Sequence, residues 1–357
     1  MADRTAIEWC DATFNSWIGC TKVSPACDHC YAAESTASRA LGVAWGAGQP
    51  RRRTSASNWK KPLQWNTQNY VECVECGWRG SVQADLAALE GRGQVVCCGA
   101  GFRPTRRRVF CASLADVFDN EVDPVWRRDL FALIRATPNL DWLLLTKRIG
   151  NANRLIAEAV SALPRDDRNG TGQFNHTPMA QWPWPNVWIG ATICNQVEAD
   201  RDIPKLLATP AAVRFLSMEP LLGPIDMQWA FPDIRTACCH TCGFRTNSVG
   251  GTCPNDGQVL RGDIGIDWVI AGGESGTAAR PMSPDWVRSL RDQCAAAGVP
   301  FLFKQWGEWI PMLGQVEGVP VRDKTTTADG WVVGRAGKKR AGRQLDGTTH
   351  TAFPEAR

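Results

Sequence analysis

Three cysteines stand close together near the start of the chain, in the stretch CTKVSPACDHC. The spacing is Cys20-x6-Cys27-x2-Cys30, which is one thiol short of a closed tetrahedral zinc site. In one interpretation His29 or Cys10 supplies the fourth ligand to a structural zinc ion. In another, the three thiolates hold three irons of a [4Fe–4S] cluster and leave the fourth iron open. A third interpretation leaves the thiols without a metal.

An open iron is the position at which radical enzymes bind S-adenosylmethionine, through its amino and carboxylate groups, and cleave it reductively. His29, directly before the last cysteine, resembles the aromatic residue of that motif. The usual spacing in those enzymes is Cys-x3-Cys-x2-Cys, whereas the first gap here is six residues. The trio also precedes a series of strand and helix patterns, where a cluster would lie over the mouth of a barrel. This position favours the cluster, and spacing alone leaves all three interpretations open.

Eight of the fifteen cysteines fall in two short, Gly-containing segments, residues 71–101 and 236–257. In the first, Cys73-x2-Cys76 is followed by Cys97 and Cys98, the two-knuckle spacing of a zinc ribbon. The second segment has a similar arrangement, in which Cys239, Cys242 and Cys253 are the expected ligands. Its fourth ligand would be Cys238, His240 or Asp256. Segments this small cannot bury a core, so we expect Zn²⁺ to stabilise both.

Length, charge and cysteine usage limit the class of protein. The 357 residues allow one large domain or several smaller ones, and the net charge of +4 permits nucleic-acid contact without arguing for it. The N-terminus has no apolar signal region, and no run of 18 apolar residues occurs. We therefore expect a soluble, cytoplasmic protein without membrane association. In a reducing compartment, so many cysteines indicate metal binding or catalysis rather than disulfides.

Six short apolar runs are typical of strands buried on both faces. They lie at 107–116, 141–148, 186–195, 213–220, 267–275 and 299–306. Helices are expected between several of them, at 123–137, 151–163, 195–209 and 283–298, and Pro204 should bend or interrupt the third. This alternation predicts an α/β fold, an incomplete (β/α) TIM-like barrel of about six or seven units. The barrel would span residues 1–310, with both Cys-rich segments as insertions and residues 311–357 as a C-terminal tail or extension.

Polar residues follow nearly every predicted strand. Because the carboxyl ends of barrel strands line one mouth, these side chains should share a site. Polar residues also end strands simply because loops begin there. As catalytic residues we predict Lys147, Glu219 and Lys304, and as cofactor-binding residues Ser113, Asn195, Gly272, Gly273 and Glu274.

Two further patterns have functional and ordinary interpretations. The stretch AGGESG (271–276) allows close backbone approach to a ligand, and Glu274 would accept from an amine, as a Gly-Gly-Glu segment does in radical enzymes; the alternative is a tight turn. In those enzymes the segment ends the second strand, whereas here it comes late. The RRR runs at 51–53 and 106–108 are candidates for phosphate contact, or simply solvated charge.

Several segments together resemble the phage gene-product-37/gene-product-68 family, a domain of unknown function. They include IEWCDATFNSWIGCTKVSPACDHCYA (7–32), LLTKR (144–148), PNVWIGATICNQ (185–196), PAAVRFLSMEPLLGPID (210–226) and the long stretch 266–309. The resemblance implies a three-cysteine motif similar to that of radical S-adenosylmethionine enzymes, with Cys20, Cys27 and Cys30 as cluster ligands. The usual residue near position 10 is Thr, so Cys10 is a departure from the pattern.

These observations predict a radical S-adenosylmethionine-like iron–sulfur enzyme of phage type, with a [4Fe–4S] cluster, S-adenosylmethionine and Zn²⁺ as cofactors. A nucleotide or another small molecule is the expected substrate, nucleic acid is a candidate partner, and an electron-donor protein would be required. One alternative is a non-catalytic, zinc-dependent nucleic-acid-binding protein. Another is a cluster-free hydrolase or transferase that uses the strand-end Lys and Glu residues.

Overall fold

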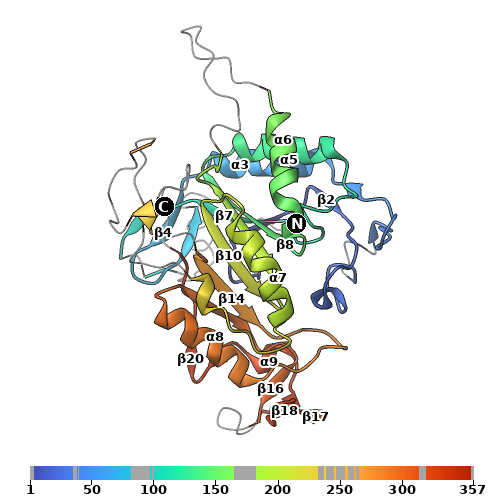
Figure 1. Cartoon of the computed structure of the whole chain (residues 1–357), viewed down its shortest axis with the longest axis vertical. Helices are drawn as coiled ribbons and strands as arrows, with labels where there is room; N and C mark the ends of the chain where they lie inside the picture. Colours follow the sequence, from blue (N-terminus) through green and yellow to red (C-terminus); the bar gives the residue numbers. More distant parts are fainter. Residues whose placement is uncertain are drawn as a thin grey trace.

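A computed structural model of the chain describes residues 4–34, 38, 40–81, 97–98, 100–164, 182–231, 237–238, 245–246, 254–255, 261–262, 265–312 and 319–354. Its centre is a curled seven-stranded sheet in which every neighbouring pair is parallel (Figure 1). The strand order is β1 (Ala12–Phe14), β7 (Arg107–Cys111), β8 (Leu140–Thr146), β9 (Val187–Thr192), β10 (Val213–Met218), β14 (Trp268–Gly272) and β15 (Phe301–Gln305). The order in space follows the order in sequence, as in a barrel that stops short of closure.

The six strands predicted from apolar runs are confirmed as β7, β8, β9, β10, β14 and β15. The seventh, β1, was missed because it has three residues, too few to establish a pattern. It pairs with β7 from Ala12 opposite Val109 to Phe14 opposite Cys111. The predicted incomplete α/β barrel is therefore correct in its coarse form.

Four helices follow strands and cover one face of the sheet (Figure 1). They are α5 (Pro124–Arg135), α6 (Ala152–Ser161), α7 (Gln196–Leu207) and α8 (Pro284–Ala296). Side-chain oxygens cap α5 and α8, where Asp123 accepts from the Val125 amide at 2.8 Å and Ser283 from the Asp285 amide at 3.2 Å. Pro204 lies inside α7, and the helix continues past it without interruption.

Aromatic side chains fill the concave face. Trp9 packs on Phe110 with ring centroids 4.5 Å apart, and Phe215 lies 5.8 Å from Trp268. Gly190 faces the same interior, and a Cβ there would lie 2.3 Å from the Phe215 ring. Because both faces of the sheet are covered, its strands are almost wholly apolar, which explains the continuous runs in the sequence. The aromatic layer also accounts for part of the high tryptophan content.

The C-terminal segment folds back on the sheet instead of forming a loose tail. It contains β16 (Trp309–Pro311), β17 (Lys324–Thr326), β18 (Val332–Arg335), α9 (Lys338–Ala341), β19 (Gln344–Leu345) and β20 (Thr348–Thr349). Phe353 stacks 4.9 Å from Trp268, whose indole nitrogen donates to the Ala352 carbonyl at 2.9 Å. Trp268 is the first residue of β14, so the chain end covers the amino-terminal end of the sheet.

The two Cys-rich segments have the same strand arrangement. In the first, β4 (Tyr70–Cys73) lies between β5 (Arg79–Ser81) and β6 (Phe102–Pro104); in the second, β11 (Ala237–Cys238) lies between β12 (Arg245–Thr246) and β13 (Arg261–Gly262). All four pairings are antiparallel. Cys239, Cys242 and Cys253 lie outside the described residues, so the second metal site stays a prediction.

The remaining short elements connect these parts. They are β2 (Trp17–Ile18), which pairs with β3 (Arg52–Arg53), helices α2 (Ala56–Trp59) and α3 (Lys61–Asn66), and 3₁₀ turns at Pro25–Cys27, Ile149–Asn151 and Gln228–Ala230. Among the described residues, no helix combines the length and apolar character needed to cross a membrane.

Candidate functional site

A cavity of about 380 Å³ lies at the carboxyl ends of the parallel strands. Its wall includes nine of the eleven residues predicted for the cluster, the cofactor and catalysis: Cys20, Cys27, Cys30, Ser113, Lys147, Glu219, Gly273, Glu274 and Lys304. A larger, more open hollow of about 760 Å³ beside α8 contains none of them. The shared mouth expected from the strand ends is therefore present in the structure.

Arg280, which was not predicted from the sequence, holds the loop that carries Cys27 and Cys30. Arg280 donates to the Pro25 carbonyl at 2.9 Å and pairs with Asp28 at 3.0 Å. Cys27 ends a 3₁₀ turn whose cap, Ser24, accepts from the Ala26 amide at 3.1 Å. Arg280 stands well outside the predicted strand ends, so no sequence signal pointed to it.

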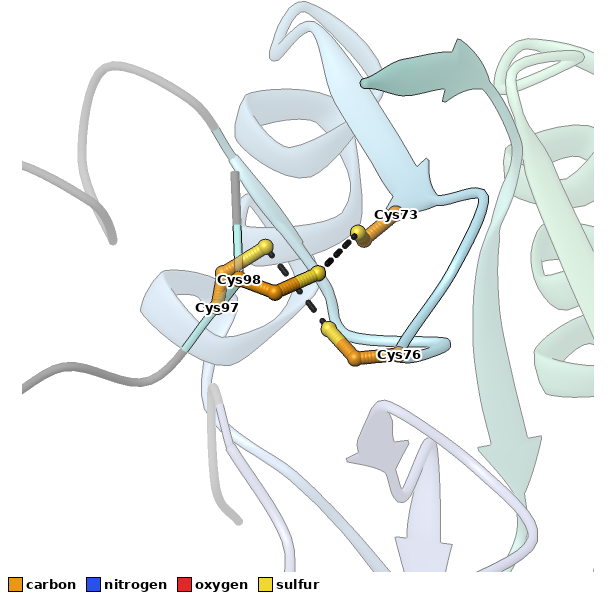
Figure 2. Close-up of side chains that lie close together, drawn as sticks. All are labelled: Cys73, Cys76, Cys97 and Cys98. Atoms are coloured by element: carbon orange, nitrogen blue, oxygen red, sulfur yellow. Dashed lines mark hydrogen bonds between the residues drawn. The ribbon is translucent and has the colours of Figure 1, made fainter. Parts of the chain in front are cut away.

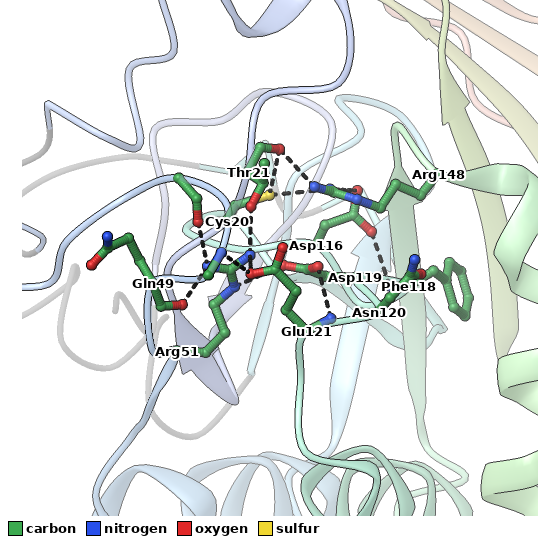
Figure 3. Close-up of polar contacts among 12 residues, drawn as sticks. Cys20, Thr21, Gln49, Arg51, Asp116, Phe118, Asp119, Asn120, Glu121 and Arg148 are labelled. Atoms are coloured by element: carbon green, nitrogen blue, oxygen red, sulfur yellow. Dashed lines mark hydrogen bonds and ion pairs between the residues drawn. The ribbon is translucent and has the colours of Figure 1, made fainter.

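Cys20 lies in a network of buried charges (Figure 3). Arg148 donates to its sulfur at 3.2 Å and to the Thr21 carbonyl at 2.6 Å, and lies 3.4 Å from Asp116. Burial and the nearby Asp116 carboxylate raise the pKa of the Cys20 thiol to about 11, although Arg148 acts in the opposite direction. At neutral pH the metal-free thiol is therefore protonated, and a bound cation would be needed to stabilise the thiolate.

The arginine runs considered for phosphate contact serve the fold. Arg51 is buried, donates to the Thr21 hydroxyl at 2.7 Å, and pairs with Asp119 at 2.8 Å (Figure 3). Arg107 and Arg108 are also buried. For these three side chains, both phosphate contact and solvated charge were wrong predictions. The sequence does not reveal which arginines have buried partners.

Glu219, at the end of β10, is held by two donors from β15. Lys304 lies 2.8 Å from each carboxylate oxygen, and the Gln305 amide donates to one of them at 2.9 Å. Gln305 also donates to the Ser275 hydroxyl at 3.0 Å. Gln305 was missed because a neutral amide in an apolar run gives no signal of its own.

Glu274 is committed to an ion pair on the other side of the cavity. Arg280 binds it through Nη2 to Oε1 at 2.7 Å and Nε to Oε2 at 2.9 Å, and His29 Nδ1 lies 3.1 Å from Oε2. The Arg280 hydrogen bonds outweigh burial and lower the pKa of Glu274. The carboxylate thus connects the Gly-Gly-Glu loop to the cysteine loop.

The glycines before Glu274 are explained by chain packing. A Cβ at Gly273 would lie 2.0 Å from the Trp306 carbonyl oxygen, so only glycine fits there. Gly272 ends β14 and accepts from the Leu221 amide at 3.0 Å. Asn195 is a helix cap, since its side chain accepts from the Glu198 amide at 2.9 Å. Neither Gly272 nor Asn195 is part of the cavity wall.

Four buried polar atoms of the cavity-lining residues have no hydrogen-bond partner within the described part of the chain. They are Trp9 Nε1, Trp45 Nε1, Thr192 Oγ1 and Gln305 Oε1. An unpaired buried donor or acceptor costs about 1–3 kcal/mol. All four belong to residues that line this one cavity.

Cys73, Cys76, Cys97 and Cys98 form a compact group in the first insertion (Figure 2). Their sulfurs all lie within 4.8 Å of one another, with Cys73–Cys98 at 3.5 Å and Cys76–Cys97 at 3.8 Å. A tetrahedron with Zn–S bonds of about 2.3 Å has edges of about 3.8 Å, so the donors fit one metal ion. Backbone amides of Cys76 and Glu75 donate to Cys73 and lower the pKa of its thiol to about 6.

The trio is arranged more widely than this quartet. Among the described residues, the quartet is the one group of three or more such ligands whose donor atoms all lie within 4.8 Å. Cys20, Cys27 and Cys30 do not form such a group, either alone or with His29 or Cys10. Ligands of three different irons must stand further apart than ligands of a single ion.

Fold and site together define an α/β half-barrel with a cysteine-lined cavity at the carboxyl ends of its strands. The chain belongs to the family described as protein of unknown function (DUF5131), which matches residues 4–354. No curated protein and no solved structure matches the chain.

Proposed function

We propose that this protein is a radical S-adenosylmethionine-type iron–sulfur enzyme. The observation that carries the proposal is the cavity itself, which brings Cys20, Cys27 and Cys30 together with Glu219 and Lys304 at the carboxyl ends of parallel strands. The resemblance to a phage protein family belongs to the same hypothesis.

The cavity residues fit a [4Fe–4S] cluster with a small polar ligand beside it. The three sulfurs do not all lie within 4.8 Å of one another, which is compatible with ligands of separate irons. Unpaired atoms on Thr192 and Gln305 would serve the polar groups of the ligand. When bound, the cluster would supply an electron, delivered by a donor protein, that cleaves S-adenosylmethionine and starts radical chemistry on a substrate.

In this proposal the protein's own side chains bind and orient the ligand and exclude water from the cavity. Arg148 stabilises negative charge on the Cys20 sulfur, and Asp116 orients Arg148. The Glu219–Lys304 pair presents a carboxylate and an ammonium group to the amino and carboxylate groups of the ligand. The aromatic layer under Trp9 and Phe110 keeps the inner end of the cavity dry.

We further propose that the quartet of the first insertion holds a structural Zn²⁺, since four thiols at tetrahedral spacing leave no open position. The segment is too small to fold on a core of its own. The equivalent site in residues 236–257 belongs to the same hypothesis and would use Cys239, Cys242 and Cys253.

Metal analysis under anaerobic conditions tests the cluster. We expect brown protein that absorbs at about 400 nm and contains about four irons per chain in addition to zinc. Cys27→Ala should abolish iron binding and the reductive cleavage of S-adenosylmethionine while zinc content is unchanged. Cys294→Ala is the matched control, because Cys294 is a buried thiol in α8, outside both groups.

A colourless, zinc-only protein after anaerobic reconstitution would reject the cluster and support the non-catalytic, zinc-dependent alternative. Iron retained by Cys27→Ala would mean that the wrong thiols were assigned. Reductive cleavage of S-adenosylmethionine that survives unchanged in Cys27→Ala would lead to the same conclusion.

A further inference from the structure

Two lysines of the cavity are not neutralised by its carboxylates. Each lining carboxylate has a cation of its own: the pairs are Asp116–Arg148 at 3.4 Å, Glu219–Lys304 at 2.8 Å and Glu274–Arg280 at 2.7 Å. Lys147 and Lys338 also line the cavity, and within the described residues neither ammonium group has an ion-pair partner. An excess of positive charge in a recess attracts an anionic ligand.

The two lysines come from distant parts of the chain. Lys147 directly follows β8, the third of the seven strands, whereas Lys338 begins α9, which packs on β16. The C-terminal extension therefore contributes to the cavity wall. Because the extension folds back on the sheet, it supplies Lys338 to the place where a ligand would bind.

Two aromatic side chains line the same cavity as these lysines. Tyr31 is 61% exposed, and its hydroxyl donates to the Ser113 carbonyl at 3.1 Å, which fixes a ring that faces solvent. Trp45 lines the same cavity, and its indole nitrogen is one of the buried donors without a partner. A fixed aromatic face offers a stacking surface to a base.

We propose that this cavity binds a nucleotide unit, with its phosphate at Lys147 and Lys338 and its base against Tyr31 and Trp45. This names the substrate class of the proposed function and rests on the same cavity. It does not require the cluster, because none of these four residues is a candidate cluster ligand. The unit is either a free nucleotide or one residue of a single strand, and the choice of probes separates these sources.

Binding to the intact protein tests the inference. The probes are the four 5′-mononucleotides, adenosine, ribose 5-phosphate and a short single-stranded oligonucleotide, each titrated by calorimetry. Nucleotide should bind more tightly than adenosine or ribose 5-phosphate, because each of these lacks one half of the recognised unit. If the oligonucleotide binds more tightly than every mononucleotide, the ligand is one residue of a single strand. If a mononucleotide binds more tightly than the oligonucleotide, the ligand is a free nucleotide.

Lysine variants separate this site from general attraction. Lys338→Ala and Lys147→Met should each raise the Kd about tenfold, a loss of about 1.4 kcal/mol. Lys339→Ala is the matched control: it is the next exposed lysine of α9 but does not line the cavity, and should change the Kd by less than about twofold. Equal losses for Lys338→Ala and Lys339→Ala would overturn the inference, as would no binding of any nucleotide or oligonucleotide.

The same titration on Cys27→Ala separates this inference from the proposed function. Retained nucleotide binding by a protein without iron supports the nucleotide site independently of the cluster. A cluster that forms and cleaves S-adenosylmethionine in a protein that binds no nucleotide would leave the proposed function standing and reject the substrate class.

Discussion

The chain places two groups of cysteines in opposite surroundings. In the quartet, backbone amides donate to Cys73 and lower the pKa of its thiol to about 6, and no other polar side chain is needed to complete the ligand set. In the trio, burial and the Asp116 carboxylate raise the pKa of Cys20 to about 11. One group is prepared for a metal by its own backbone, whereas the other depends on what the cavity binds.

Under the proposed function, this difference separates a structural metal site from a functional one. Four converging thiols close the coordination of one ion and leave no position for a ligand. Three separated thiols cannot close a site, and they share their cavity with charged groups such as Lys147 and Lys304. Residue type is therefore a weak guide to function here, and the completeness of the ligand set is the informative quantity.

The largest expected effect breaks the quartet. Cys76→Ser should remove zinc from the first insertion and unfold it locally, since structural zinc sites contribute about 10–16 kcal/mol of apparent binding energy. Iron content should stay unchanged, because the trio lies in a separate element. Zinc and iron per chain, measured on the purified variant, check both statements. Simultaneous loss of both metals would show that the two regions depend on each other.

A pH series on the metal-free, reduced protein compares the thiols directly. A thiol is protonated below its pKa, so at pH 7 about one in 10,000 of Cys20 is thiolate. Alkylation of Cys20 should rise about tenfold per pH unit, or about a thousandfold from pH 7 to pH 10. Cys73 lies in the insertion that unfolds without zinc, so its alkylation should have the midpoint of an ordinary cysteine, at about pH 8.5. Rates from peptide mass spectrometry give the midpoints, and a shared midpoint would contradict the comparison.

The sheet and its helices could be predicted because the sequence features that specify them lie within short segments. Strands buried on both faces must be continuously apolar, and Asp123 and Ser283 capped helices with a proline at the first position. The strand-end rule then placed six of the predicted residues around one cavity without any knowledge of their contacts. β1 was not predicted because its three residues are too few to show a hydrophobic pattern.

The rest depended on contacts between distant residues. Asn195 has the polar type and strand-end position of a ligand, yet it caps a helix. Arg280 joins the cysteine loop to the Gly-Gly-Glu loop across 252 residues of sequence from Asp28, a pairing that no local pattern encodes. Lys338 lines the cavity, although it belongs to a segment predicted from its composition to be a tail or extension. Side-chain partners and chain reversal are properties of the folded chain.

The smallest expected effect compares one arginine in each region. Arg148→Gln removes the charged donor to Cys20 and leaves Asp116 facing the sulfur, so iron should bind about ten- to a hundredfold more weakly, a loss of about 1.5–3 kcal/mol. Arg79→Gln is the counterpart, because Arg79 ties the insertion to Asp11 at 3.2 Å without touching the quartet. Zinc affinity of that variant should change by less than about tenfold, since all four ligands belong to the insertion. Iron and zinc competition titrations with chelators measure both affinities. Iron affinity unchanged in Arg148→Gln would mean that the cavity does not prepare Cys20 for its metal, and the contrast between the two cysteine groups would then rest on ligand spacing alone.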